Sequence, residues 1–169
     1  MTKKLTVSCE FFPPKTDKGI VNMRKVREKL APLKPEFYSV TFGAGGSTQD
    51  NTLDAVIDIQ QDSVKTSINA APHLSCVGSS SEGIREILDT FKANDIRRIV
   101  ALRGDLPSGM RDPGDFRYAN ELIEFIRKET GDNFTIEVAA YPEVHPQAQS
   151  AKIDLINFKR KVDAGADSA

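Results

Sequence analysis

Apolar and polar positions along the chain switch repeatedly between two periods. Short β-like runs begin near Leu5, Phe37, Ile68, Arg98 and Thr135. Each run is followed by a loop, and then by a stretch in which apolar residues return every three or four positions, as on one face of a helix. The repeat is roughly 30 to 37 residues long, which is the size of one βα unit. The pattern therefore predicts five βα units in succession.

Four of the helical stretches are well marked. One has Ile84, Ile87, Leu88 and Phe91 at positions i, i+3, i+4 and i+7, behind a polar capping stretch at 79–82. The others carry apolar residues before a stop signal: Ile20, Met23, Leu30 and Leu33 before Pro35; Tyr118, Leu122, Phe125 and Ile126 before Gly131; and Leu155, Phe158 and Val162 before Gly165. A weaker pattern at 49–63 predicts the remaining helix.

Strict alternation of strand and helix predicts an α/β fold with a parallel sheet covered by helices. Two architectures fit. A flavodoxin-like, doubly wound domain is complete with five strands, and the length of 169 residues favours it. A (β/α)8 TIM barrel has eight units, of which this chain would supply about the first five. Residues 163–169 read as a helix exit that turns into another strand, and the first run alternates apolar with polar residues. Both features favour the barrel, with 1–169 as a single, incomplete TIM-barrel catalytic domain.

Composition and charge limit the classes of binding partner to be expected. Lys and Arg total 23 against 24 Asp and Glu, so the chain lacks the excess of positive charge that is typical of nucleic-acid-binding proteins. No apolar run approaches the roughly 20 residues that span a bilayer, and the N-terminus lacks the apolar core of a signal peptide. Cys9 and Cys76 lie far apart in apolar runs, as buried free thiols do in a reducing compartment. We expect a cytoplasmic protein with no membrane or nucleic-acid partner.

Polar residues gather where the predicted strands end, and this is where parallel α/β folds place their sites. The five ends are 10–16, 41–48, 73–76, 103–107 and 141–146. Glu10 is the most informative residue, because a carboxylate late in an apolar strand is expensive to bury. Desolvation raises the pKa of a carboxyl and suits it to general acid catalysis near neutral pH. An inward carboxylate paired with a structural Lys or Arg explains Glu10 equally well.

The other strand ends are each open to two interpretations. The glycine-rich segment 43–47 indicates backbone close to a phosphate, or a simple tight turn. Arg103 and Asp105 either contact a ligand or form a surface ion pair. His73 and His145 either donate to a ligand or are structural, and no third ligand with metal-type spacing accompanies them. The rings of Phe42 and Tyr141 either stack on an aromatic cofactor or close the core.

Six motifs in this order resemble methylenetetrahydrofolate reductases of the bacterial, barrel-only kind over nearly the whole chain. They are EFFPPK at 10–15, SVTFGA at 39–44, APHL at 71–74, LRGDLP at 102–107, AAYPEVHP at 139–146 and DLINFKRKVDAGA at 154–166. The resemblance implies a flavin enzyme on a TIM barrel, with FAD as cofactor and NADH or NADPH as electron donor. By a ping-pong route it would reduce the folate substrate 5,10-methylenetetrahydrofolate to 5-methyltetrahydrofolate. It also implies a homo-oligomer.

The same resemblance assigns roles residue by residue. Glu10 would be the acid that opens the five-membered ring of the folate, and Asp105 would lie beside the flavin and the pterin. Residues expected to contact the cofactors are Thr41 (on the nicotinamide side), Phe42, Ala44, His73, Arg103, Gly104, Asp105, Ala119, Tyr141, His145, Ala148, Asp154, Asn157, Arg160 and Lys161. The basic pair at 160–161 suits a pyrophosphate. No metal is implied.

Two departures from the family pattern matter. Phe42 stands where family members often carry tyrosine. The family also continues for about three more strands, and a barrel without them has two open edges. We therefore expect the 169-residue chain alone to be a poor or inactive catalyst. Two alternatives remain: a flavodoxin-like FMN-binding electron-transfer domain, and a non-enzymatic fragment whose sheet is completed by another chain.

Overall fold

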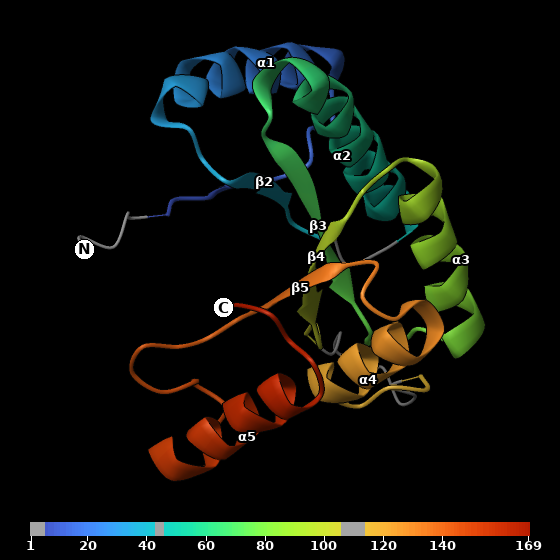
Figure 1. The fold of residues 1–169 in the computed structure, drawn as a ribbon, viewed down its shortest axis with the longest axis vertical. Coiled ribbons are helices and arrows are strands. Elements are labelled where there is room, and N and C mark those ends of the chain that lie inside the picture. Colours follow the sequence, from blue (N-terminus) through green and yellow to red (C-terminus); the bar gives the residue numbers. More distant parts are fainter. Residues whose placement is uncertain (1–5, 43–45, 106–113) are drawn as a thin grey trace. The chain divides into compact units, whose positions relative to one another are not determined.

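The computed structural model describes residues 6–42, 46–105 and 114–169. Strands and helices alternate along the whole described chain (Figure 1). The elements are β1 (Cys9–Phe11), α1 (Asp17–Leu30), the 3₁₀ helix η1 (Ala31–Leu33), β2 (Phe37–Val40), α2 (Gly46–Thr66), β3 (Asn69–Ser75), α3 (Ser81–Ala93), β4 (Arg98–Leu102), α4 (Ala119–Thr130), β5 (Thr135–Val138) and α5 (Ala151–Asp163). The five predicted βα units are confirmed.

The order of the strands decides between the two architectures. The sheet runs β1-β2-β3-β4-β5, so each strand neighbours the next one in the chain. A doubly wound domain reverses direction part-way through its order, whereas a barrel winds in one direction. Glu10 pairs with Ser39 and Ser39 with Ala71 in parallel register, so that the three lie in one row across the first strands. The barrel-type prediction is confirmed, and the flavodoxin-like alternative is wrong.

Several element boundaries differ from the sequence-based expectation. Helix α1 ends at Leu30, and the chain continues as the 3₁₀ helix η1, because Pro32 lacks the N–H that an α-helix needs. Helix α2 covers 21 residues, although its apolar pattern is weak. Helix α4 ends as predicted, with Gly131 at φ 57° after Thr130. Helix α5 ends at Asp163, before the predicted stop at Gly165.

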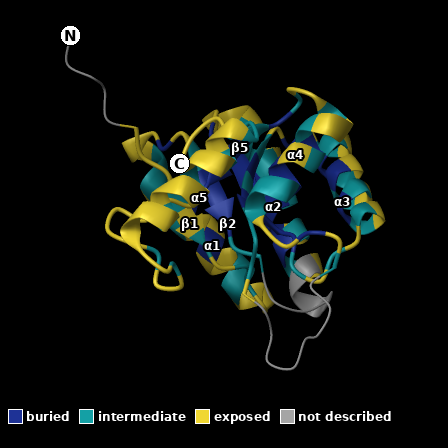
Figure 2. Ribbon diagram, turned by 90° about the horizontal axis from the view of Figure 1, so that it is seen from below, coloured by how far each residue is buried: buried dark blue, intermediate teal, exposed yellow. Residues whose placement is uncertain are grey.

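The chain divides into two compact units, and each has its own core. The first comprises residues 1–73 and 91–98, and the second residues 74–90 and 99–169. Fully buried side chains of the first unit include Val40, Val56 and Ile96, and those of the second include Leu88, Leu122 and Ile136. Helix α5 buries no residue, and its surface is largely exposed in Figure 2. Among the described residues, no helix has both the length and the hydropathy of a membrane span.

The residues after α5 return to the edge of β5. Asp167 N donates to Ile136 O at 2.9 Å, and Val138 N donates to Ser168 O at 2.9 Å. Glu137 and Ser168 form a parallel bridge, and Ser168 Oγ donates to the Glu137 carboxylate at 2.6 Å. The sequence predicted that this segment turns into another strand, and in the structure it forms an isolated parallel bridge to β5.

Candidate functional site

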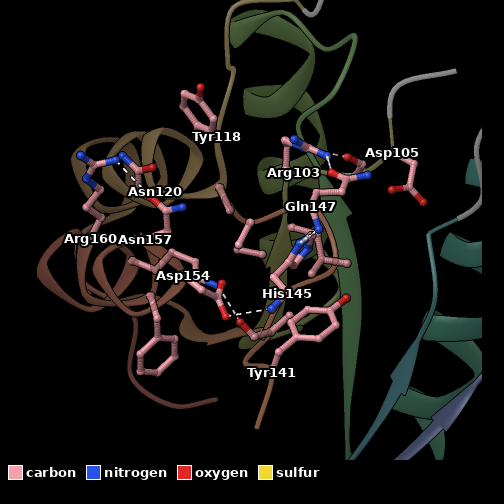
Figure 3. Close-up of a pocket in the computed structure, with 18 residues that line it drawn as sticks. Arg103, Asp105, Tyr118, Asn120, Tyr141, His145, Gln147, Asp154, Asn157 and Arg160 are labelled. Carbon is pink, nitrogen blue, oxygen red and sulfur yellow. Dashed lines mark hydrogen bonds between the residues drawn. The ribbon is translucent and has the colours of Figure 1, made fainter. Parts of the chain in front are cut away.

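A pocket of about 410 Å³ opens in the second unit at the C-terminal ends of β4 and β5 (Figure 3). Residues at the end of β4, the start of α4, the loop after β5 and one face of α5 line it. It gathers most of the residues that were expected to contact FAD: Arg103, Gly104, Asp105, Ala119, Tyr141, His145, Ala148, Asp154, Asn157, Arg160 and Lys161. The rule that sites lie at the carboxyl ends of parallel strands therefore located a real concavity.

The end of β4 is packed tightly against the end of β3. Gly104 has φ +85°, and a Cβ placed on it would lie 2.0 Å from Ser75 Oγ and 2.8 Å from Val77 Cγ1. Ser75 Oγ and Val77 N both donate to Arg103 O at 2.9 Å, so Ser75 Oγ is held in place. Position 104 therefore needs glycine, both for its conformation and for lack of space.

The Arg103 side chain does not form the surface ion pair considered from the sequence. Its Nε donates to Gly104 O at 3.1 Å, and its Nη2 donates to Gln147 Oε1 at 2.8 Å. Among the described residues it makes no ion pair with Asp105, whose side chain is exposed at the pocket. The reason is local: the arginine turns back over its own backbone towards the loop after β5.

The loop after β5 and the first turn of α5 together hold His145 from three sides. Its backbone N donates to Asp154 Oδ2 at 2.9 Å, and its ring meets that of Tyr141 edge-on, with centroids 4.5 Å apart. Gln147 N donates to His145 Nδ1 at 3.1 Å, so a neutral ring carries its proton on Nε2. Tyr141 is 49% exposed, which contradicts the alternative that its ring closes the core.

Helix α5 presents two cations to the pocket. Arg160 Nη1 donates to Asn157 Oδ1 at 3.1 Å, and Lys161 Nζ donates to Ala139 O at 2.5 Å. Burial lowers the pKa of Lys161 from its ordinary value, and the nearby Asp154 carboxylate partly opposes this effect. An anionic ligand placed beside this lysine would favour its charged form.

Four lining residues with polar or aromatic side chains were missed from the sequence: Tyr118, Asn120, Gln147 and Phe158. Tyr118 and Asn120 flank the predicted Ala119, and Phe158 follows the predicted Asn157. Gln147 lies between the predicted His145 and Ala148. The one sequence signal that could have identified these four residues is therefore that each lies beside or between predicted positions.

In the first unit, Glu10 differs from the expectation of a desolvated carboxylate. Its side chain is 54% exposed, so the burial argument is wrong for this residue. Its partner is neither Lys nor Arg, since Glu10 Oε2 lies 3.1 Å from Nε2 of the buried His73. The neighbour across the strand pair is the small Ser39, which lets the carboxylate reach β3. No hydrogen bond to the buried His73 Nε2 is found among the described residues, so the two groups form an ion pair only when the ring is protonated.

The His73 pair gives a direct prediction of pH dependence. Burial lowers the pKa of His73 from 6.5, and the Glu10 carboxylate opposes this by stabilising the charged ring. We therefore expect the ring to titrate below 6.5, and the Glu10→Gln substitution to lower its midpoint further. Since the unfolded chain takes up this proton more readily, His73 reduces the free energy of unfolding as pH falls below about 6.5.

NMR can follow this titration because the chain has 2 histidines. The spectrum of a His145→Gln variant assigns the remaining imidazole signals to His73. A His73 midpoint above 6.5, or one that stays in place in Glu10→Gln, would contradict the prediction.

The remaining expected contacts lie at the end of β2, also in the first unit. Thr41 N donates to Phe11 O at 3.0 Å, and Thr52 Oγ1 donates to Thr41 O at 3.0 Å, which fixes the backbone there. Thr41 and Phe42 are both half-buried. Ala44, with the rest of 43–45, lies outside the described residues.

The two cysteines are free thiols. Cys76 is buried, and burial raises its pKa to about 11, which makes it a poor nucleophile. Cys9 is half-buried rather than buried as expected, because it lies on the edge strand β1. In the ranges 6–42, 46–105 and 114–169, no cluster of His, Cys, Asp and Glu could hold a metal ion.

Comparison with known proteins identifies the family. The model of the family described as "Methylenetetrahydrofolate reductase" matches residues 1–169. The chain belongs to the methylenetetrahydrofolate reductase family. The 5,10-methylenetetrahydrofolate reductase of Escherichia coli K12 is 46% identical over 166 residues, which cover 98% of this chain and 54% of that protein. The enzyme of the same name from Pectobacterium carotovorum is also 46% identical, with 53% of its length covered. "Methylenetetrahydrofolate reductase (NADH) 1" of Zea mays is 39% identical over 173 residues.

The chain thus spans about half the length of its bacterial relatives. Solved structures show the same fold at much lower identity. A Schiff-base-forming fructose-1,6-bisphosphate aldolase and an archaeal fructose 1,6-bisphosphate aldolase both superimpose with a TM-score of 0.55, at 13% and 12% identity. Each match covers 83% of this chain and about half of the aldolase. At such identity the likeness concerns the fold alone.

Proposed function

We propose that this protein reduces 5,10-methylenetetrahydrofolate to 5-methyltetrahydrofolate with FAD as cofactor and NADH or NADPH as electron donor. Membership of the reductase family supports the folate reaction. The observation that supports the flavin is the pocket at the ends of β4 and β5, which brings together residues from four segments of the chain. No other described pocket gathers so many of the residues expected to contact FAD.

The residues of the pocket fit an extended, anionic cofactor with an aromatic ring system. Its volume of about 410 Å³ lies within the range of small-molecule sites. Gly104 lines the pocket with backbone atoms, and its φ of +85° and its close packing on Ser75 require glycine there. The half-exposed Tyr141 offers an aromatic surface, and Arg160 and Lys161 offer positive charge. When bound, FAD would supply the hydride chemistry, accepting from NAD(P)H and donating to the folate.

The chain's own residues would bind and orient the reactants. Arg160 and Lys161 would neutralise the charge of the pyrophosphate. The Asp154 carboxylate would accept hydrogen bonds from the ribose or adenine, and the Asn157 amide would accept or donate them. Arg103 and Gly104 would contact the cofactor at the end of β4. Donor and folate would use one site in turn, in a ping-pong sequence.

The carboxyl groups of Glu10 and Asp105, each at the end of a strand, would have different roles: one would donate a proton, and the other would place a negative charge beside the flavin. Glu10 would donate the proton that opens the five-membered ring of the folate. Its carboxylate lies 3.1 Å from Nε2 of His73 on β3, the second strand along the sheet from β1. Asp105 would place a negative charge beside the ring system and so oppose the accumulation of further negative charge there.

The visible absorbance spectrum tests the flavin directly. The purified protein is mixed with FAD, freed of unbound cofactor, and then reduced anaerobically with NADH. We expect a bound-flavin spectrum that bleaches on addition of NADH. A matched pair of variants on α5 locates the site: Arg160→Ala with Lys161→Ala should lose FAD, whereas the exposed Lys152→Ala with Lys159→Ala should retain it. A colourless protein that ignores FAD, or equal loss in both pairs, would overturn the assignment of this pocket.

A further inference from the structure

Gln147 occupies a position in the pocket that neither the motifs nor the family resemblance assigned. It lies between His145 and Ala148 in the loop that joins β5 to α5, and its side chain lines the pocket. Figure 3 shows this side chain beside Arg103, which comes from the end of β4. Gln147 thus connects two walls of the pocket.

The backbone of Arg103 is fixed, but its guanidinium needs a partner. Arg103 O accepts from Ser75 Oγ and Val77 N, which anchors the residue to the end of β3. The guanidinium uses one of its five N–H donors on its neighbour Gly104 O and a second on Gln147 Oε1 at 2.8 Å. An arginine side chain has about 2 kcal/mol of rotamer entropy to lose, so a second contact is what selects one orientation.

Gln147 itself is held where it can serve as that partner. Its backbone N donates to His145 Nδ1 at 3.1 Å, and Ala148 N donates to His145 O at 2.8 Å, which closes a tight turn. Asp154 Oδ2 accepts from His145 N and ties this turn to α5. The Gln147 side chain therefore projects from a fixed base.

We propose that Gln147 is a positioning residue that orients the Arg103 guanidinium towards an oxygen acceptor of FAD. A neutral amide suits this task, because it accepts one hydrogen bond and leaves the full positive charge of the arginine for the ligand. The three N–H donors that these two contacts do not use remain to meet the acceptor. This inference rests on the proposed FAD site, and it adds a residue that acts on the cofactor only through Arg103.

A double-mutant cycle on FAD affinity tests the proposal. FAD binding is measured by quenching of its fluorescence in the wild type, Gln147→Met, Arg103→Met and the double variant. Methionine approximates the aliphatic part of each side chain and removes its hydrogen-bonding groups. We expect Gln147→Met to raise the Kd for FAD about three- to tenfold in the wild type, and to change it little in the Arg103→Met background. Gln149→Met, an exposed glutamine two positions further along, is the matched control and should bind as the wild type does.

The outcomes separate this inference from the proposed function. Wild-type protein that binds FAD while Gln147→Met binds it equally well would overturn the positioning role alone. An equal loss of affinity in both backgrounds would mean that Gln147 acts independently of Arg103, for example by shaping the loop, and would also overturn it. Wild-type protein that fails to bind FAD would overturn the proposed site and this inference with it. Coupling between the two substitutions is a readout that a merely structural role of Gln147 would not produce.

Discussion

Glu10→Gln is expected to slow the reduction of methylenetetrahydrofolate by a factor of about 10² to 10⁴, the usual contribution of a general acid. Glutamine keeps the size and the reach of the side chain but has no acidic proton to give to the folate. The same variant should oxidise NADH with menadione as acceptor at close to the wild-type rate, because that half of the ping-pong sequence needs no acid. Stopped-flow absorbance can measure the two half-reactions separately.

A matched control is Glu86→Gln, an exposed glutamate on α3 that is absent from the pocket lining. It should behave as the wild type in both half-reactions. Equal slowing of both half-reactions in Glu10→Gln would show that the variant disturbs the site as a whole. Unchanged folate reduction would contradict the assignment of Glu10 as the acid.

The environment of Glu10 shows what sequence reasoning could and could not supply. That a carboxylate at the end of β1 is chemically unusual followed from its place in an apolar run. Its surroundings did not follow, since His73 comes from a strand two positions away in the sheet and the small Ser39 lies between them.

The fold was predictable because its signals are local. The starts of β2, β4 and β5 were predicted near Phe37, Arg98 and Thr135, and the strands begin at these residues. The strand-end rule then placed the pocket residues on one edge of the sheet. The ends of helices were less predictable, because α1 becomes a 3₁₀ helix at Pro32 without an interruption in its apolar pattern.

Hydrogen-bond partners within the site could not be predicted in the same way. Arg103 has Asp105 nearby in sequence, yet it bonds to Gln147 from another loop. A long side chain with several rotamers reaches many candidate partners, and only the packed structure selects one. The same holds for Arg127, which in the sequence is simply one of the basic residues in the last turn of α4.

In the structure, every N–H of the Arg127 guanidinium has an acceptor. Nε and Nη2 donate to Gly165 O at 3.0 and 2.8 Å, and Nη1 donates to Phe134 O at 2.8 Å and Gly131 O at 3.2 Å. Nη2 also pairs with Asp167 Oδ2 at 2.6 Å. Asp167 in turn accepts from Ile136 N at 2.7 Å, so the arginine joins α4, β5 and the segment after α5.

Arg127→Met is therefore expected to lower the free energy of unfolding by about 3 kcal/mol, because it strips three carbonyls and one carboxylate of a charged donor. Methionine retains the aliphatic part of the side chain, so the loss reports the hydrogen bonds rather than the packing. Urea denaturation followed by circular dichroism measures the change. Circular dichroism reports the unfolding of both compact units together. A fluorescent dye attached at Cys9 reports the unfolding of the first unit separately, and the two transitions coincide only if the units unfold as one.

The neighbouring Lys128→Met is the matched control, since this exposed lysine lies on the same turn of α4 and carries the same charge. It should change the free energy of unfolding by less than about 0.5 kcal/mol. If the two variants were equally stable, the Arg127 contacts would be replaced by water at no net cost. If Arg127→Met alone is destabilised, the edge of β5 depends on a residue that no periodicity or motif distinguished. The stability of that edge matters for function, because β5 leads directly into the loop that carries Tyr141, His145 and Gln147.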